Sequence, residues 1–203
     1  MKGIALVLAL VLISSCQIKR DRQIQDDYAA WSAVNTDRTW TRAAETAVSA
    51  TTLTDQVPKD IQKFCPEYSA LDTKFRTMFW AGLLSAMAKY ESNFKPETAY
   101  TEKFRDHAGN NVVSRGLLQI SIESANQKQY SCLISNSEDL HDPAINLSCG
   151  ARILSRWIEA DGVVAYSNGG NRGGARYWSV LRPALDILPK ISAMTRELSF
   201  CSV

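Results

Sequence analysis

The stretch that decides the fold is Met78-Phe79-Trp80-Ala81-Gly82-Leu83-Leu84-Ser85-Ala86-Met87-Ala88-Lys89-Tyr90-Glu91-Ser92. It is mostly apolar, which predicts a helix. Asn93 can cap the C-terminal end of this helix, and Pro96 stops it from continuing. One carboxylate lies near that end on the apolar side. At about 100° per residue, Glu91 shares a face with Trp80, Leu84 and Met87.

Glu91 therefore has two reasons to keep its proton. Apolar neighbours disfavour the charged form of a carboxyl group, and so does the negative end of the helix dipole. A glutamate that is partly protonated near neutral pH can act as a general acid. The alternative interpretation is a solvated glutamate at a frayed helix end, and motifs elsewhere in the chain favour the acid.

The N-terminus has the pattern of an export signal. A basic start is followed by an apolar run over residues 3–13, which is too short to span a bilayer. The tetrapeptide Ile13-Ser14-Ser15-Cys16 resembles a bacterial lipobox, so residues 1–15 are predicted to be a lipoprotein signal peptide and Cys16 an acylated N-terminus. Gln17 follows, which by the same resemblance favours the periplasmic face of the outer membrane. A plain secretory signal is the alternative.

The remaining chain is expected to contain a polar tether over residues 16–27 and one domain over residues 28–203. The chain has 23 basic and 21 acidic side chains and a formal net charge of +2. It has no basic patch interleaved with aromatic residues, so nucleic acid is not an expected partner. We expect a monomer.

The domain has four cysteines. An even number of cysteines in an exported chain indicates disulfides, so two are predicted. We expect one bond to close the short loop from Cys132 to Cys149 and another to join Cys65 to Cys201, although the two other pairings stay open. Zinc is the alternative use of these cysteines. The chain has no Cys-x-x-Cys and only two histidines, so neither a metal nor a cofactor is expected.

Helical patterns dominate the rest of the domain. Residues 28–50 are predicted to be helical in two pieces, and residues 51–73, which contain two prolines, to form short helices joined by turns. Helical signal returns at residues 122–130, 145–160 and 174–182. Residues 97–113 are predicted to be a loop or a small hairpin. The expected class is mainly α.

Four segments follow one another between about residues 75 and 180. They are Ala88-Lys89-Tyr90-Glu91-Ser92-Asn93-Phe94-Lys95-Pro96, Ser114-Arg115-Gly116-Leu117-Leu118-Gln119-Ile120-Ser121, Asp142-Pro143-Ala144-Ile145-Asn146-Leu147-Ser148-Cys149-Gly150 and Val164-Ala165-Tyr166-Ser167-Asn168-Gly169-Gly170. Together they resemble the motifs of the family 1 (SLT-type) lytic transglycosylases. This resemblance implies a lysozyme-like fold, stapled here by disulfides.

The chain departs from the family pattern in two places. The bridge over residues 93–115 is longer than in the family, and we expect it to rim the cleft. Ser167 also separates Tyr166 from Asn168, whereas the family has the asparagine directly after the tyrosine.

The resemblance implies a function and a set of site residues. Glu91 would cleave the β-1,4 bond between N-acetylmuramic acid and N-acetylglucosamine in peptidoglycan, acting alone as acid and then base, to give a 1,6-anhydro end. Tyr166 would lie near Glu91 and orient it or stabilise charge. The substrate-binding residues implied are Ser92, Ser114, Gly116, Leu118, Gln119 and Asn168. Asp142, Pro143 and Asn146 are interpreted as a turn and helix cap. Trp157, Tyr177 and Trp178 are candidates either for stacking on sugars or for the core.

Two other functions stay open. A goose-type lysozyme-like hydrolase would need a second carboxylate to hold water, and the bridge offers Glu97, Glu102 and Asp106. A non-catalytic lipoprotein could instead bind peptidoglycan strands and tie the membrane to the wall. All three readings have peptidoglycan as the partner.

Overall fold

A computed structural model describes residues 28–202. The predicted signal peptide, the tether and Cys16 lie outside the described residues. Within residues 28–202 no helix combines the length and the apolar character that a bilayer crossing requires.

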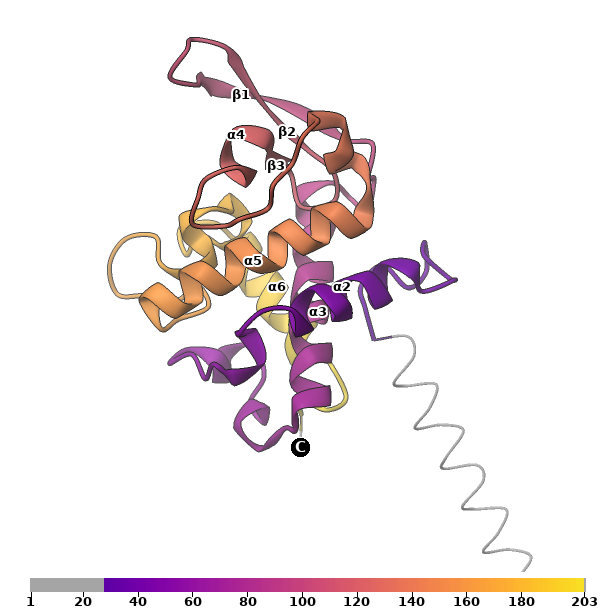
Figure 1. The fold of residues 1–203 in the computed structure, drawn as a ribbon. Helices are drawn as coiled ribbons and strands as arrows, with labels where there is room; N and C mark the ends of the chain where they lie inside the picture. Colours follow the sequence, from indigo (N-terminus) through magenta and orange to yellow (C-terminus); the bar gives the residue numbers. More distant parts are fainter. Residues whose placement is uncertain (1–27, 203) are drawn as a thin grey trace, which may run out of the picture.

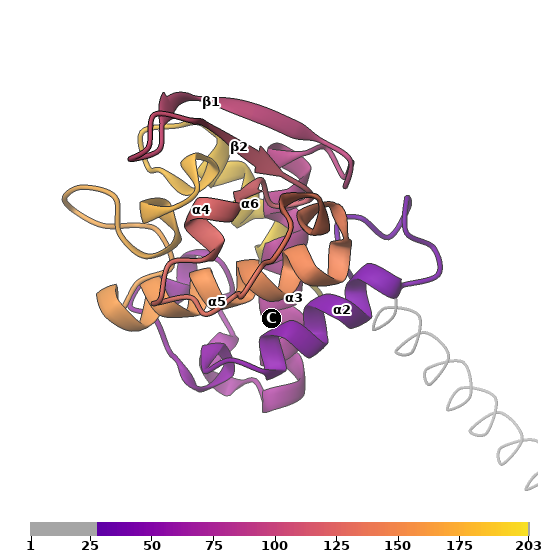
Figure 2. The ribbon, with the colours of Figure 1, turned by 45° about the horizontal axis from the view of Figure 1, so that its top comes forward.

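The described chain is mainly helical with one small sheet, as the sequence predicts (Figures 1 and 2). The helices are α2 (Thr39–Ser49), α3 (Thr73–Glu91), α4 (Ile122–Ala125), α5 (Pro143–Asp161) and α6 (Ile187–Arg196), and the strands are β1 (Ala99–Arg105), β2 (Asn111–Arg115) and β3 (Ile120–Ser121). Short 3-10 helices join them at Leu53–Asp55, Ile61–Lys63, Tyr68–Ala70, Ser137–His141, Gly173–Arg176 and Ser179–Leu181.

Helix α3 is the central element. It begins where Asp72 accepts a hydrogen bond from the backbone N–H of Phe75. All eleven residues over 78–88 are buried, because α2, α5 and α6 pack around the helix (Figure 1). A helix that is apolar on every side belongs in a core, which is what the opening stretch of sequence predicts.

The end of α3 places Glu91 at the edge of this core. Asn93 and Phe94 both have left-handed backbone conformations, with φ of 51° and 63°. The N–H of Phe94 bonds back to the carbonyl of Ala88, so the chain turns sharply away from the helix axis. Glu91 is therefore the last helical residue and adjoins the start of the hairpin segment.

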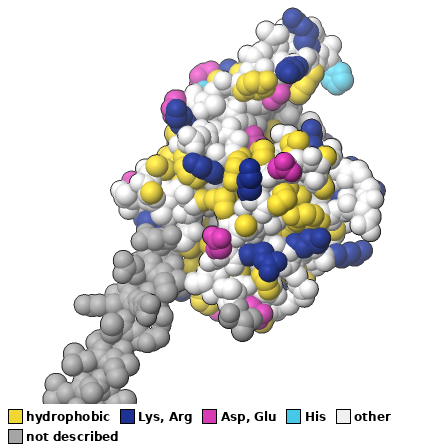
Figure 3. Space-filling model, turned by 180° about the vertical axis from the view of Figure 1, so that it is seen from behind, with side chains coloured by type: hydrophobic (Ala, Val, Ile, Leu, Met, Phe, Trp, Pro, Cys, Tyr) yellow, Lys and Arg dark blue, Asp and Glu magenta, His cyan; other side chains and the backbone are white. Residues whose placement is uncertain are grey.

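Residues 97–113, predicted to be a loop or a small hairpin, form a hairpin. Strands β1, β2 and β3 make an antiparallel sheet in that order. Tyr100 lies opposite Ser114, and Arg105 lies opposite Asn111, with a change of register between these pairs. The hairpin stands over one end of α3 and projects from the body, which is also visible from behind (Figures 2 and 3).

Both disulfides form with the expected pairing. Cys65 is bonded to Cys201, and Cys132 to Cys149. The first joins the segment before α3 to the end of the described chain, and the second ties the start of α5 to the loop before it.

Four segments differ from the sequence prediction. Residues 28–50 contain one helix, α2, because residues 30–34 form turns instead of the first of the two predicted helical pieces. Residues 174–182 form two 3-10 helices instead of an α-helix, and only residues 122–125 of the region 122–130 are α-helical. Helix α6 was not predicted. Pro189 obscures its pattern in the sequence, but a proline in the first turn of a helix costs no hydrogen bond.

Candidate active site

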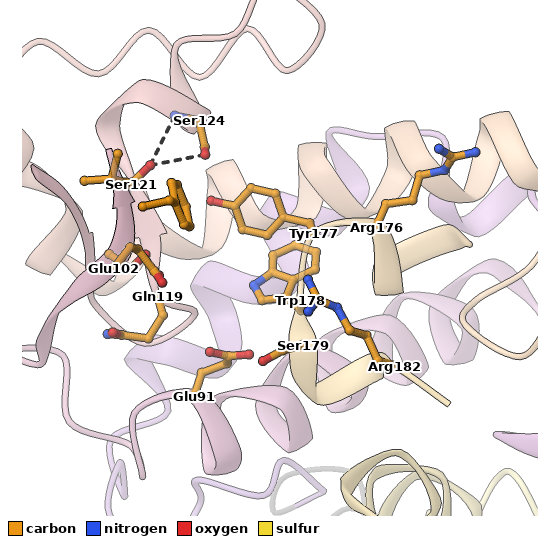
Figure 4. A pocket seen from close by; sticks show the side chains of 13 residues that line it. Glu91, Glu102, Gln119, Ser121, Ser124, Arg176, Tyr177, Trp178, Ser179 and Arg182 are labelled. Carbon is orange, nitrogen blue, oxygen red and sulfur yellow. Dashed lines mark hydrogen bonds between the residues drawn. The ribbon is translucent and has the colours of Figure 1, made fainter. Parts of the chain in front are cut away.

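A cavity of about 410 Å³ opens between the hairpin and the segment 176–182, with Glu91 at its floor (Figure 4). This volume falls in the range of small-ligand sites. The lining residues are Glu91, Glu102, Phe104, Val112, Ser114, Gln119, Ser121, Ser124, Arg176, Tyr177, Trp178, Ser179 and Arg182.

Glu91 is the buried acid of this cavity. Its Oε1 atom is buried and has no hydrogen-bond partner among the described residues. Burial, followed by the negative charge of Glu102, raises the pKa of Glu91 from 4.5 to about 8, although the positive charge of Arg182 opposes the rise. A carboxyl group with this pKa carries its proton at neutral pH and can donate it to a substrate.

The hairpin contributes the second carboxylate of the cavity. The hydroxyl of Ser114 donates a hydrogen bond of 2.6 Å to Oε1 of Glu102, and both side chains line the cavity. Glu97 is exposed and does not line it. Asp106 instead accepts hydrogen bonds from the hairpin turn at Ala108 and Asn110, which lower its pKa. Of the three carboxylates that the sequence offers, Glu102 is the one that faces Glu91.

The opposite wall is held by an ion-pair cluster at the end of α5. Asp161 accepts two hydrogen bonds from the guanidinium of Arg176, at 2.6 and 2.8 Å, and one from Arg172. The N–H of Gly173 adds a fourth. These donors, Arg176 first, lower the pKa of Asp161 to about 2. The cluster anchors the segment that carries Tyr177 into the cavity.

Arg182 differs from Arg176 in having no carboxylate partner within hydrogen-bond distance among the described residues. Its Nε is buried without a hydrogen-bond partner, as is Oε1 of Glu91 in the same cavity. The positive charge of Arg182 lowers the pKa of Glu91 and so opposes the effect of burial.

Two of the predicted substrate-binding residues line the cavity, Ser114 and Gln119. The side-chain amide of Gln119 donates to the carbonyls of Thr98 and Gly116, and its backbone is left-handed with φ of 48°. These contacts hold Gln119 in place at the base of the hairpin.

The other four do not line the cavity. Ser92 is buried, and its hydroxyl donates to the carbonyl of Leu117. Leu118 is wholly buried in the core. Gly116 has φ of 76°, and a Cβ there would lie 2.1 Å from the carbonyl oxygen of Leu140, so glycine is required by packing. Asn168 is exposed on a loop.

Tyr166 is not among the residues that line the cavity. Its hydroxyl lies 3.1 Å from the hydroxyl of Ser192 on α6, and its ring packs against Phe64. The tyrosine of the cavity is Tyr177, whose pKa is raised by burial.

Two of the three aromatic candidates line the cavity, Tyr177 and Trp178. Trp178 is almost fully buried, and its indole N–H donates to the carbonyl of Leu118, so it forms a fixed wall. Trp157 does not line the cavity; its indole N–H donates to the hydroxyl of Tyr130.

Sequence reasoning missed several lining residues. They are Phe104, Val112, Ser121, Ser124, Arg176, Ser179 and Arg182. Phe104 and Val112 could have been found from alternation along the hairpin strands, whereas the serines and arginines carry no periodic signal. No three His, Cys, Asp or Glu side chains of residues 28–202 are grouped as a metal site would require.

Comparisons with known proteins show the family of this chain. Residues 72–177, just over half of the chain, match the family model "Transglycosylase SLT domain". The wild-type structure of Bd0314 DslA, form 2, is 45% identical with a TM-score of 0.80, over 86% of this chain and 97% of that one. Two Glu-to-Gln mutants of the same protein are 43% and 44% identical, with TM-scores of 0.81 and 0.80, covering 87% and 86% of this chain and 99% and 97% of theirs. No curated protein matches.

Proposed function

The chain belongs to the transglycosylase SLT domain family, with its lysozyme-like fold and peptidoglycan substrate, and on that premise we propose that it is a peptidoglycan lytic transglycosylase. It cleaves the β-1,4 bond between N-acetylmuramic acid and N-acetylglucosamine with Glu91 as its single acid and base. The enzyme acts at the periplasmic face of the outer membrane, held by an acylated Cys16. The observation that carries the proposal is the buried carboxyl group of Glu91 on the floor of the cavity.

In the first step, Glu91 donates its proton to the glycosidic oxygen, and the bond to the muramic acid C1 breaks. Positive charge then develops on the sugar ring in an oxocarbenium-like state. The raised pKa of Glu91 supports this role because it keeps the acid protonated at neutral pH.

In the second step, Glu91 is a carboxylate and accepts the proton of the 6-hydroxyl of the same sugar. That oxygen closes onto C1 to give the 1,6-anhydro ring, and no water is consumed. Arg182 supports this step, because its positive charge favours the carboxylate form that exists between the two proton transfers.

A second candidate is hydrolysis, and the placement of Glu102 favours it. A hydrolase needs a carboxylate that activates water or stabilises the ring, and Glu102 lines the same cavity as Glu91. The two mutated glutamates of Bd0314 DslA are eleven positions apart, as are Glu91 and Glu102 in this chain. The hydrogen bond from Ser114 to Glu102 holds this carboxylate but leaves Oε2 open.

The masses of the products separate the two candidates. Digestion of purified sacculi should release muropeptides with 1,6-anhydro ends, which are lighter by one water than reducing ends. We expect anhydro ends from the wild-type enzyme. Reducing ends as the main product would overturn the transglycosylase and establish the hydrolase, and no products at all would leave a binding protein.

A matched pair of variants tests the role of Glu102 in the same assay. If Glu91 acts alone, Glu102→Gln keeps cleavage activity. Loss of the nearby negative charge should then lower the pKa of Glu91, so the alkaline limb of the pH–rate profile moves to lower pH by up to about one unit. Glu97→Gln, at an exposed position outside the cavity, should leave the profile unchanged. Abolition of activity by Glu102→Gln would favour the hydrolase.

A further inference from the structure

The hairpin presents one ordered face to the cavity. Side chains alternate along a strand, so Tyr100, Glu102 and Phe104 of β1 share a face. Tyr100 lies opposite Ser114, and residues directly opposite one another in an antiparallel pair point to the same side. Since Ser114, Glu102 and Phe104 all line the cavity, this face is the one turned toward Glu91.

Phe104 is the exposed aromatic residue of this face that lines the cavity. Its exposed fraction is 61%, although its ring lines the cavity. The register of the two strands changes between Thr101 and Arg105, around Phe104. Such irregularities occur beside active sites, where they redirect a side chain. Ligand pockets are lined by apolar and aromatic side chains together with a few polar groups, and this cavity has both.

The hairpin tip is already organised. Asp106 accepts hydrogen bonds from the backbone N–H groups of Ala108 and Asn110, and from the side-chain amide of Asn110. The guanidinium of Arg105 donates to the carbonyl of Gly109 at 2.7 Å. Because these bonds fix the turn next to Phe104, little conformational entropy remains to be lost when a ligand contacts the ring.

We infer that Phe104 forms a saccharide subsite on the hairpin, where its ring packs against the apolar face of a sugar in the glycan strand beyond the bond that is cleaved. Tyr100, exposed by 51% on the same face, adds a second aromatic contact. This inference rests on the proposed function, since it takes peptidoglycan as the ligand. The glycan is the occupant because Phe104 lines the same cavity as Glu91, which is where the strand is cleaved in the proposed reaction.

Binding without turnover tests this subsite. In a Glu91→Gln background, the affinity for purified sacculi is compared between that parent and proteins that also carry Phe104→Ala or Phe104→Trp. We expect Phe104→Ala to weaken binding about tenfold, as the loss of an aromatic stacking contact does. Phe104→Trp keeps an aromatic ring at this position and should bind sacculi like the parent. Leu133→Ala, at a residue that is 84% exposed and lies outside the cavity, is the matched control and should bind like the parent.

The outcomes separate this inference from the proposed function. Phe104→Ala should unfold at the same temperature as the parent, because the side chain is largely exposed. Unchanged affinity of Phe104→Ala for sacculi would overturn the subsite even if the enzyme is active. A loss of affinity for phospholipid vesicles, without a loss for sacculi, would also overturn it and assign the ring to a membrane surface. If the wild-type enzyme cleaves nothing yet binding still depends on Phe104, the proposed activity fails and the subsite stands.

Discussion

Replacement of Glu91 by glutamine is expected to reduce the rate of peptidoglycan cleavage by at least about 10³-fold, since general acid catalysis contributes roughly 10²–10⁴-fold and the same group serves in both steps. Glutamine keeps the size of the side chain and its place in the cavity but has no acidic proton. The rate is measured as release of dye from labelled sacculi, or as clearing of a gel that contains cell-wall material.

The stability of the Glu91→Gln variant shows that lost activity is not lost folding. The folded-state pKa of Glu91 is about 8, above the value of 4.5 for a free side chain. Ionisation therefore reduces the stability of the folded state progressively as the pH rises from about 4.5 to 8. Glutamine removes this cost, so at pH 8 the variant should unfold at the same or a higher temperature than the wild type. Glu97→Gln is the control and should cleave at the wild-type rate. If Glu91→Gln also cleaved at that rate, another residue would have to be the acid.

Replacement of Asn146 by alanine is expected to have the largest effect on stability. Asn146 is fully buried on α5. Its Oδ1 accepts from the N–H of Leu118, and its Nδ2 donates to the carbonyls of Arg115 and Leu140, all at 2.9 Å. Alanine removes the partner of three backbone groups, two of them in buried hydrogen bonds, so we expect a loss of about 3–5 kcal/mol of unfolding free energy. Thermal and denaturant unfolding measure this loss.

The matched control is Asn168→Ala, at an exposed loop position for which no hydrogen bond is found within residues 28–202. It should change the free energy of unfolding by less than about 0.5 kcal/mol. Asn146→Asp keeps the shape of the side chain but loses both donors, and it should also be strongly destabilised. A loss below about 1 kcal/mol in Asn146→Ala would show that the network does not hold α5 to the segment 115–118.

Glu91 could be identified as the candidate acid from the sequence because its environment is local. A helix that is apolar on all sides must be buried, and a carboxyl group at its end is then partly buried with it. The hairpin could be predicted from the polar residues that interrupt the helical pattern. The disulfide pairing could be predicted from the number of cysteines and the length of the loops between them. These features depend on residues close in sequence or on few alternatives.

The sequence did not predict that Tyr177 is the tyrosine that lines the cavity. The carboxylate of Asp60 accepts the backbone N–H groups of Val164, Ala165 and Tyr166. This contact joins segments more than 100 residues apart and fixes the start of the loop that carries Tyr166. A sequence motif cannot reveal such a contact, and the hydroxyl of Tyr166 lies beside Ser192 on α6.

Asn146 shows the same limit. Its position after Asp142 and Pro143 is typical of a helix start, and Asp142 does cap α5 by accepting from Ala144 and Ile145. Asn146, however, is not a cap but a link to a distant backbone segment. Helical periodicity places it on the buried side without identifying its partners.

The proposed mechanism depends on a proton that Glu91 holds at neutral pH. A measurement of the pKa of its carboxyl group tests this most directly. This pKa can be read from the ¹³C chemical shift of the side-chain carboxyl in labelled wild-type protein titrated from pH 4 to 10, with Glu91→Gln used to assign the signal. We predict a midpoint near 8. A midpoint near 4.5 would mean that Glu91 is ionised when the enzyme works, and it would contradict its role as the acid.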